Sequence, residues 1–329
     1  MNRRPYSMIL GTGRSVPEKI LTNTDLEQMV DTSDEWITTR TGIKQRHVAE
    51  PGTPLSTFAS EAARKALEDA NVRAEELDLI IVGTVTGDMK FPATACLVQE
   101  QIGAKRAVAF DISAACSGFL YALQVAEGLM LTNHYQKVLV IGGEVLTSMV
   151  DWHDRDTCVL FGDGAGAVIL GPSSEGRGML VAQMFSNGEH SRLLYNPGGG
   201  SLHPPTIENV REGLHSIRME GQEVFRNAVV SMCNALKKTL KEGDIRADEL
   251  DLVIPHQANL RIIEAVAKRF KITDDKVFVN VDRYGNTSAA SIPIALDEAR
   301  KDARISEGSL VAMVTFGAGF TWAAAVVRM

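Results

Sequence analysis

A nine-residue segment occurs twice in this chain of 329 residues, and it constrains the fold more than any other feature of the sequence. Residues 73–81 read RAEELDLII and residues 246–254 read RADELDLVI, so that seven of nine positions are identical and the other two are conservative. In both places a helical pattern precedes the segment, and the second part of the segment is typical of a buried strand. The repeat therefore predicts two copies of one αβ unit.

The repetition continues beyond these segments. The apolar run Ala107 to Ile112, which predicts a buried strand, aligns with Val277 to Asp282 at an offset of 170 residues, and the same offset aligns Cys116 with Asn286. We therefore expect a second strand at Val277 to Asp282. Helices that alternate with buried strands predict mostly parallel sheets with helices on their faces.

Two segments poor in charge follow the aligned residues, at Ser117 to Met130 and from Thr287 onward. Helices without a charged face are buried, so we expect this pair to pack together between two sheets. Pseudo-symmetry would then bring Cys116 and Asn286 close together. The Pro-, Ser- and Gly-containing run from Pro172 to Gly178 predicts the boundary between the halves, which we place at residues 1–175 and 176–329.

The composition excludes several classes of protein. Hydrophobic residues make up 45% and charged residues 23%, as in ordinary globular proteins, and a net charge of −7 argues against a general nucleic-acid binder. The four cysteines are scattered without a CxxC pair, so neither a disulfide framework nor a metal site is expected. We see no signal peptide and no membrane-spanning run, and we expect a reducing, cytoplasmic location.

Cys116 lies at a predicted turn between a strand and a helix. The N–H groups at a helix start favour the thiolate, which is the nucleophilic form of cysteine, although a lone cysteine beside alanines is more often small core filler. His256 directly follows the predicted strand Leu252 to Pro255, and sites in α/β sheets form at the carboxyl ends of strands. Cysteine with histidine and asparagine is a known set for nucleophilic catalysis.

Several separated motifs resemble those of the β-ketoacyl-ACP synthase III family, where ACP is the acyl carrier protein. They are AACSG at 114–118, HQAN at 256–259, YGNTSAAS at 284–291, DTSDEW at 31–36, RTGI at 40–43 and FGAGFTW at 316–322. The resemblance implies the thiolase-like α/β fold, in which two similar halves form five layers in the order αβαβα.

The resemblance also implies an acyltransferase that initiates type II fatty acid synthesis. Such an enzyme joins acetyl-CoA, or another short acyl-CoA, to malonyl-ACP by a decarboxylative Claisen condensation and releases CO2 and CoA. Cys116 would carry the acyl group, and His256 and Asn286 would donate hydrogen bonds to the malonyl thioester oxygen. Backbone N–H groups of Cys116 and Ala318 would form the oxyanion hole.

Binding residues are carried over from the resemblance in the same way. Residues implied to bind CoA are Thr32, Trp36, Arg40 and Arg155, with Trp36 and Arg155 flanking the adenine. Residues implied to bind the acidic carrier protein are Gln257, Ala258, Asn259, Leu260 and Arg261, with Arg226 as a further basic residue. Phe91 would close the acyl pocket of a second copy in a homodimer. No cofactor or metal is implied.

Two alternatives stay open. One is a polyketide-type synthase with the same Cys-His-Asn set and a larger starter, and the other is a non-catalytic protein of this fold that only carries acyl chains. Asn286 argues against elongating synthases, which use a second histidine, and against degradative thiolases, which use a second cysteine. The sequence does not distinguish acetyl, propionyl and branched primers.

Overall fold

The computed structural model describes residues 7–132, 134–173 and 176–329, and two β-sheets form its centre. The first sheet has the strand order β1-β7-β6-β4-β5 and the second has the order β11-β12-β13-β8. The strands of the first sheet are β1 (Ser7–Ser15), β4 (Leu79–Gly83), β5 (Val108–Ile112), β6 (Val138–Val145) and β7 (Asp163–Pro172). Those of the second are β8 (Gly178–Ser186), β11 (Leu252–Pro255), β12 (Leu310–Gly317) and β13 (Thr321–Arg328).

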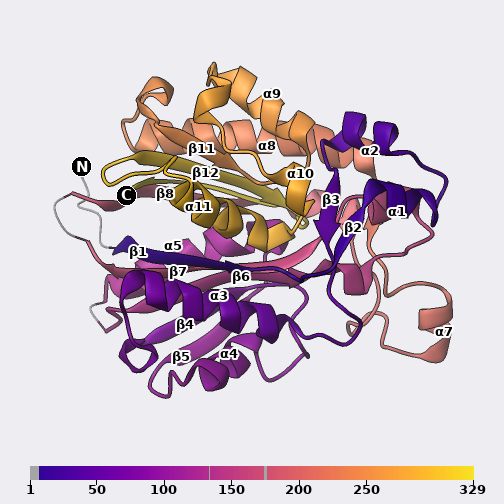
Figure 1. Ribbon diagram of the computed structural model, residues 1–329, viewed down its shortest axis with the longest axis horizontal. Helices are drawn as coiled ribbons and strands as arrows, with labels where there is room; N and C mark the ends of the chain where they lie inside the picture. The colour runs from indigo at the N-terminus through magenta and orange to yellow at the C-terminus, as the bar shows by residue number, and fades with distance from the viewer. Residues whose placement is uncertain (1–6, 133, 174–175) are drawn as a thin grey trace.

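Three layers of helices alternate with the two sheets (Figure 1). The middle layer contains α5 (Gly118–Met130) and α11 (Ser291–Lys301), each of which packs against strands of both sheets. The outer layers are α3 (Leu55–Ala70) with α4 (Thr94–Ile102) and α8 (Gly221–Glu242) with α9 (Leu260–Phe270). The predicted αβαβα order and the burial of the two middle helices are therefore confirmed, although the second half of α11 is rich in charge, with Asp297, Glu298, Arg300 and Lys301.

The repeated segments form the same local structure. Each is a one-turn 3-10 helix followed by a strand. η1 (Ala74–Glu76) precedes β4, which lies inside the first sheet, and η5 (Ala247–Glu249) precedes β11, which lies at the edge of the second. In both copies the glutamate at the third position accepts a hydrogen bond from the backbone N–H of the arginine that precedes the turn, at 3.1 Å and 2.6 Å. This capping bond satisfies a free N–H at the start of the turn, which explains why the pattern recurs.

Glycines let the middle layer approach the first sheet closely. A Cβ atom on Gly142 of β6 would lie 2.2 Å from the carbonyl oxygen of Ala289, and one on Gly83 of β4 would lie 2.5 Å from the carbonyl carbon of Gly118. Neither position can hold a larger residue without moving backbone. The turns that start the middle helices are thus fixed directly above the strands.

The prediction of a strand at Val277 to Asp282 is wrong. Only a single bridge between Val253 and Val277 and a 2.9 Å bond from the Phe278 N–H to the Val253 oxygen continue the sheet there. The chain then turns into a short helix, α10 (Val281–Tyr284). The second sheet consequently has one strand fewer than the first among the described residues.

The side chain of Gln257 replaces the missing part of the strand. Its Nε2 donates to the carbonyl oxygens of Pro255 at 2.8 Å and Phe278 at 3.1 Å. Its Oε1 accepts from the N–H groups of Asn280 at 2.9 Å and Val281 at 3.2 Å. One amide side chain, only 1% exposed, therefore satisfies four backbone groups that a regular ladder would have paired.

The expectation that β5 is buried is also wrong for the single chain. Among the described residues β5 pairs with β4 alone, so it forms one edge of the first sheet, and Val108 is 50% exposed. Its apolar side chains make it resemble a core strand in sequence. The boundary predicted near residue 175 falls between β7 and β8, and the division into 1–175 and 176–329 stays a prediction.

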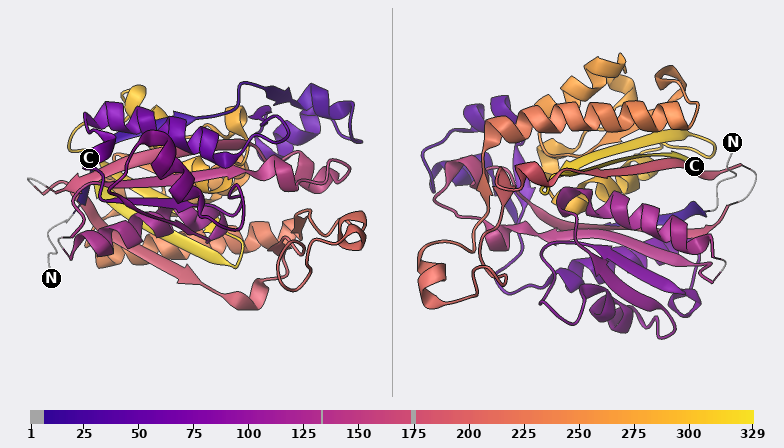
Figure 2. Two further views of the ribbon diagram at one scale, coloured as in Figure 1. Left: turned by 90° about the horizontal axis from the view of Figure 1, so that it is seen from below. Right: turned by 180° about the vertical axis from the view of Figure 1, so that it is seen from behind.

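Smaller elements gather at the end of the layers where β4, β6 and β11 finish (Figures 1 and 2). They are β2 (Ile20–Thr22), α1 (Asn23–Glu27), α2 (Asp34–Thr41), β3 (Gln45–His47), α6 (Arg155–Cys158), β9 (Leu194–Tyr195), α7 (Ile207–Arg211) and β10 (Arg218–Met219). This end of the molecule also holds the residues that the sequence marks as functional.

Replacing Gln257 with alanine tests its structural role. The variant leaves four buried backbone groups without partners, so we expect unfolding free energy to fall by roughly 2–4 kcal/mol. Urea denaturation monitored by circular dichroism measures the change. Gln222→Ala, on the exposed face of α8, is the matched control and should shift stability by less than about 0.5 kcal/mol. A loss no larger than that of the control would contradict the role.

Candidate active site

Cys116 lies in a one-turn 3-10 helix, η2 (Ala115–Ser117), between β5 and α5. A matching turn, η7 (Ser288–Ala290), precedes α11, and the two turns pack against each other. Ala115 and Ser288, the first residues of the two turns, have φ angles of 47° and 49°. The sequence alignment therefore needs a correction, because the position equivalent to Cys116 is Ala289 and Asn286 precedes the second turn.

Residues of the second sheet hold the cysteine turn in place. The Thr315 hydroxyl donates to the carbonyl oxygen of Cys116, and the Thr321 hydroxyl donates to that of Ala114, both at 2.9 Å. A Cβ atom on Gly317 would lie 2.7 Å from the backbone nitrogen of Cys116. The nucleophile candidate comes from one half of the chain, but its conformation is fixed by the other.

The environment of Cys116 favours the neutral thiol. The pKa of this thiol is raised to about 12, chiefly by burial and to a smaller extent by the Glu144 carboxylate, while a hydrogen bond with Ser288 lowers it. The sequence had suggested a thiolate stabilised by the start of α5. Desolvation outweighs that effect, so forming the thiolate requires a group that accepts the proton.

Asn286 is held by a segment of the first half. Its backbone N–H donates to the Leu160 oxygen at 2.8 Å, and its carbonyl accepts from the Gly162 N–H at 3.0 Å. The side-chain Oδ1 accepts from the N–H of Ser288 at 2.9 Å. This bond fixes which way the amide is turned and leaves the Nδ2 group of Asn286 to donate to a substrate.

His256 follows β11 and is 3% exposed. Its Nδ1 lies 2.6 Å from the Ser291 hydroxyl, which also accepts from the N–H of Gln257 at 3.4 Å. This contact is compatible with a ring that accepts the hydroxyl hydrogen at Nδ1 and carries its own hydrogen on Nε2. Burial lowers the pKa of His256 to about 3, so the ring is a neutral hydrogen-bond donor.

The protonation state of His256 can be measured directly. We expect the 15N NMR signals of a histidine-labelled sample to show the Nε2–H tautomer and no titration between about pH 5 and about pH 8. Ser291→Ala should remove the bond that fixes the tautomer and change the Nδ1 shift. A His256 ring that titrates near pH 6.5, the usual histidine value, would contradict this assignment.

The residues implied to bind the nucleotide of CoA lie around α2. The Arg155 guanidinium carbon lies 5.0 Å from the centre of the Trp36 ring, and that of Arg40 lies 5.9 Å from it. The Thr32 hydroxyl oxygen is buried and has no hydrogen-bond partner. A flat ring bound between Trp36 and Arg155 needs about 7 Å, twice the ~3.5 Å contact distance, so Arg155 would have to move outward.

The segment implied to bind the carrier protein is only partly available at the surface. Ala258, Asn259 and Leu260 are half-buried and Arg261 is exposed. Gln257 is buried, and its side chain bonds to the backbone of residues 255, 278, 280 and 281, so its part in binding the carrier protein stays a prediction. Asn259 ties this segment to the end of α2 by donating to the Arg40 oxygen at 3.1 Å.

The Phe91 side chain is 84% exposed in the single chain. Met89, Val85 and Val108, which are 52%, 39% and 50% exposed, come from the same loop and from the adjoining edge strand. Ala318 follows Gly317, the residue packed against the cysteine backbone, and its own carbonyl accepts from Thr321 at 3.1 Å.

Sequence reasoning missed Glu144 and Ser288. Glu144 is next to last in β6 and is fully buried, and burial raises its pKa to about 7. The Ser288 hydroxyl donates to Glu144 at 3.3 Å, and an interaction with Ser288 lowers the pKa of the Cys116 thiol. The signal in the sequence was a lone carboxylate directly after the apolar run 138–143.

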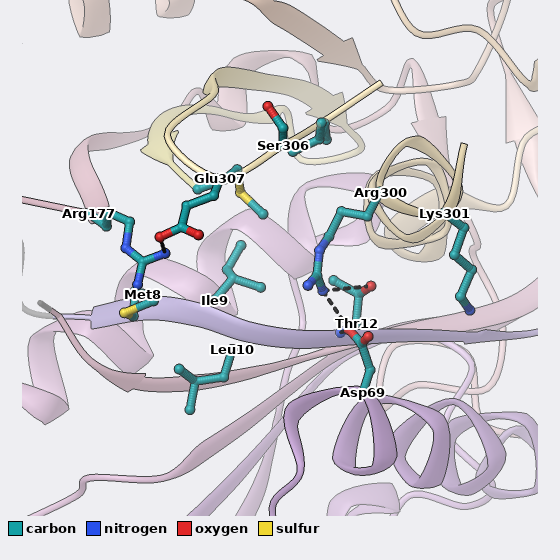
Figure 3. Close-up of a pocket in the computed structure, with 12 residues that line it drawn as sticks. Met8, Ile9, Leu10, Thr12, Asp69, Arg177, Arg300, Lys301, Ser306 and Glu307 are labelled. Carbon is teal, nitrogen blue, oxygen red and sulfur yellow. Dashed lines mark hydrogen bonds and ion pairs between the residues drawn. The ribbon is translucent and has the colours of Figure 1, made fainter. Parts of the chain in front are cut away.

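A cavity of about 510 Å³ opens at the opposite end of the sheets (Figure 3). The start of β1 and the end of β13 line it, whereas Cys116 and His256 follow the ends of β5 and β11. Its cationic side chains face acidic partners, since Arg300 lies 2.6 Å from Asp69 and Arg177 lies 2.6 Å from Glu307. It is therefore separate from the candidate active site.

In residues 7–132, 134–173 and 176–329, no three His, Cys, Asp or Glu side chains gather as a metal ion would require. Within the same ranges, no helix has both the length and the apolar character needed to cross a bilayer.

This chain matches two family models and is similar in sequence to a named relative. A family model described as 3-oxoacyl-[acyl-carrier-protein (ACP)] synthase III matches residues 110–188, and the model of its C terminal matches residues 240–329. A relative from Caldanaerobacter subterraneus subsp. tengcongensis, named beta-ketoacyl-[acyl-carrier-protein] synthase III, is 55% identical over 320 residues, which are 97% of each chain.

Solved structures confirm the fold class. The crystal structure of 3-oxoacyl-[acyl-carrier-protein] synthase III from Aquifex aeolicus VF5 has a TM-score of 0.92 and 49% identity, and the match covers 98% of this chain and 100% of that one. The priming β-ketosynthase from the R1128 polyketide pathway has a TM-score of 0.91 and 33% identity, covering 100% and 98%. The fold is thus thiolase-like, and the full-length similarity establishes that this chain belongs to the β-ketoacyl-[acyl-carrier-protein] synthase III family.

Proposed function

We propose that this chain starts type II fatty acid synthesis by condensing acetyl-CoA, or another short acyl-CoA, with malonyl-ACP to give 3-oxoacyl-ACP, CO2 and CoA. The observation that carries the proposal is the packing of the Cys116 turn against the turn that follows Asn286, at the same end of the sheets as a neutral His256. A nucleophile beside two neutral hydrogen-bond donors suits acyl transfer followed by carbanion chemistry.

In the first half-reaction Cys116 attacks the acyl thioester and CoA leaves. Negative charge develops on the thioester oxygen, and backbone N–H groups of Cys116 and Ala318 stabilise it. The close contact between Gly317 and the Cys116 nitrogen supports this role, because it sets the two backbone segments side by side.

In the second half-reaction malonyl-ACP loses CO2, and the resulting carbanion attacks the acyl-cysteine. Charge then develops on the malonyl thioester oxygen, where His256 Nε2 and Asn286 Nδ2 donate hydrogen bonds. A neutral ring supports this role, because a cationic one would transfer its proton to the enolate and quench it. Asn286 is neutral at every pH, so its donor is never lost by titration.

The CoA nucleotide binds at α2 in this proposal. Trp36 offers a flat face, Arg155 and Arg40 supply positive charge, and the unpartnered Thr32 hydroxyl supplies a hydrogen bond. Arginine binds phosphate with paired N–H groups, which suits the phosphorylated end of CoA. Binding requires Arg155 to swing away from Trp36.

The carrier protein docks at the start of α9. Arg261 is exposed and stacks on Phe225 at 5.1 Å, and Arg226 lies on the neighbouring helix α8, where it pairs with Glu223 at 2.9 Å. Local positive charge attracts an acidic partner even though the whole chain is acidic. Ala258, Asn259 and Leu260 supply half-buried contacts beside it, and Gln257 supports the segment from below.

A homodimer covers the edge of the first sheet. Val108 and Phe91 expose apolar side chains beside an unpaired strand edge, an arrangement that exposes a monomer to aggregation. A second copy that pairs along β5 would bury them and bring Phe91 to its partner's acyl pocket. We place the enzyme in the cytoplasm, and we propose that it acts without a cofactor or metal.

A polyketide-type priming synthase is the second candidate, and the 33% identity to such an enzyme favours keeping it. Both candidates share the cysteine chemistry and differ in the acyl group accepted. Relative kcat/KM values for acetyl-, propionyl- and branched acyl-CoA, followed by identification of the product, distinguish them. A carrier without activity would give no product at all.

Incubation with labelled acetyl-CoA tests the proposed function. We expect one acetyl group on the peptide that contains Cys116, and its release as acetoacetyl-ACP after malonyl-ACP is added. Cys116→Ala should take up no label, because the nucleophile is absent. Asn286→Ala should acylate normally but condense about 100-fold more slowly, a typical loss for one donor in such a site.

The matched control for this experiment is Cys233→Ala, which removes a half-buried cysteine on α8 and should leave labelling unchanged. Label on any residue other than Cys116 would refute the covalent intermediate. Normal condensation by Asn286→Ala would refute the role of that amide.

Charge at the sheet edge tests the homodimer. Val108→Lys places a cation on the exposed edge strand, so we expect the mass from light scattering to fall from that of a dimer to that of a monomer. Val230→Lys, at an exposed apolar position on α8, should leave the mass unchanged. A wild-type chain that is monomeric at micromolar concentration would contradict the homodimer.

A further inference from the structure

Glu144 is a fully buried carboxylate that the mechanism above does not use. Its oxygens accept hydrogen bonds from the Thr84 hydroxyl at 3.1 Å, from the N–H of Val85 at 3.2 Å and from the N–H of Thr86 at 3.0 Å. These donors hold the side chain in one position at the end of β6. Such an arrangement stabilises a carboxylate that water cannot reach.

Ser288 offers a path between this carboxylate and the nucleophile. Its hydroxyl donates to Glu144 Oε1 at 3.3 Å, and an interaction with Ser288 lowers the pKa of the Cys116 thiol. Ser288 belongs to η7, which packs both against β6, the strand of Glu144, and against η2, the turn of Cys116. One hydroxyl can accept a proton on one side while donating its own on the other.

The path connects two groups that cannot both be ionised. Two negative charges in a buried site repel each other strongly, and the Glu144 carboxylate raises the pKa of the Cys116 thiol accordingly. Burial meanwhile raises the pKa of Glu144 to about 7, so that it gains a proton readily. The pair therefore holds one negative charge and one proton, and a shift along Ser288 exchanges their places.

We propose that Glu144, acting through Ser288, accepts the thiol proton of Cys116 during acylation and returns it during condensation. This inference rests on the acyl-Cys116 function proposed above. Glu144 touches no substrate in this account. It acts by setting the protonation state of the cysteine.

The proton balance closes over one catalytic cycle. In acylation the S–H bond of Cys116 breaks, the Ser288 oxygen takes that proton, and the hydroxyl proton passes to Glu144. The sulfur electron pair forms the bond to the acyl carbon, and CoA leaves as a thiolate that takes a proton from solvent. In condensation the carbanion attacks the acyl carbon, and the departing Cys116 thiolate regains the proton from Glu144 through Ser288.

Other charged groups near Glu144 face elsewhere. Asp163 on β7 is paired with Val145, the next residue of β6, so its side chain lies on the opposite face of the sheet from Glu144. Asp88 accepts a bond from the Ser56 N–H, and Asp111 accepts from the N–H groups that start α4. η7 carries no titratable side chain, and Cys116 is the titratable group of η2.

A single-turnover measurement separates this role from a structural one. The rate of acetyl transfer from acetyl-CoA to Cys116 is followed by quenched-flow mass spectrometry, and decarboxylation of malonyl-ACP is measured separately. For wild type, acylation should slow tenfold per pH unit below about pH 7, because a protonated Glu144 cannot accept the proton. His256, with a pKa of about 3, cannot produce that limb.

Two variants interrupt the path at different points. Ser288→Ala and Glu144→Gln should each acylate about 100-fold more slowly, and both should lose the limb near pH 7. Each should keep malonyl-ACP decarboxylation within about threefold, because that step uses His256 and Asn286. Ser288→Ala leaves the bonds from Glu144 to residues 84–86 in place, so it remains informative if Glu144→Gln folds poorly.

Glu144→Asp and Thr84→Val complete the set. The aspartate keeps an ionisable group and should restore part of the rate and the pH limb. Thr84→Val removes a hydroxyl whose hydrogen bond lowers the pKa of Glu144, so the pH limb should move to higher pH. Acylation at the wild-type rate with an unchanged pH profile in Ser288→Ala and Glu144→Gln would overturn the relay.

The remaining outcomes are equally decisive. Equal losses in acylation and decarboxylation would show that Ser288 and Glu144 only support the structure, and would also overturn the relay. If wild type itself acquires no acetyl group on Cys116, the proposed function fails. If wild type is acylated and the variants match it, only the relay fails.

Discussion

The contact between η2 and η7 is the interaction on which the rest of this structure depends. These equivalent turns begin the two middle helices and meet where the halves of the chain face each other. Thr315 and Thr321 of the second sheet hold the backbone of the cysteine turn, while residues 160–162 of the first half hold Asn286. Neither half can form the site alone, because the second half fixes the backbone around Cys116 and the first half fixes Asn286.

Much of this architecture is predictable because it follows from apolar periodicity and repetition. The repeated segments gave two αβ units, and the charge-poor helices gave the middle layer. His256 could be chosen among seven histidines because it alone follows a buried strand in a repeated unit. Cys116 and Asn286 were chosen by an alignment at an offset of 170 residues. The structure corrects this offset, because the position equivalent to Cys116 is Ala289, but the turn of Cys116 and the turn that follows Asn286 still pack together.

The errors concern polar groups and surfaces that no periodicity reveals. The segment Val277 to Asp282 is apolar enough for a strand, but the Gln257 side chain takes over its backbone bonds. β5 has the apolar sequence of a core strand although it forms an edge. Apolar character alone does not show whether a strand is covered by its own chain or by a second molecule. Glu144 follows an apolar run, but its hydrogen-bond donors at residues 84–86 lie about sixty positions away in the sequence, where no local pattern points to them.

Burial explains the electrostatics of the site. Desolvation keeps the Cys116 thiol and the His256 ring neutral and raises the pKa of Glu144 to about 7. In such surroundings the hydrogen bonds offered to a developing oxyanion are strong. The central claim is that an acyl group is held at the interlocked turns with its oxygen among these donors.

A crystal structure of the enzyme soaked with acetyl-CoA tests that claim most directly. The account predicts an acetyl thioester on the Cys116 sulfur, with its carbonyl oxygen within hydrogen-bond distance of the N–H groups of Cys116 and Ala318 and with His256 and Asn286 free for the malonyl group. An acetyl group bound elsewhere, or a thioester oxygen held by His256 and Asn286 instead, would contradict it.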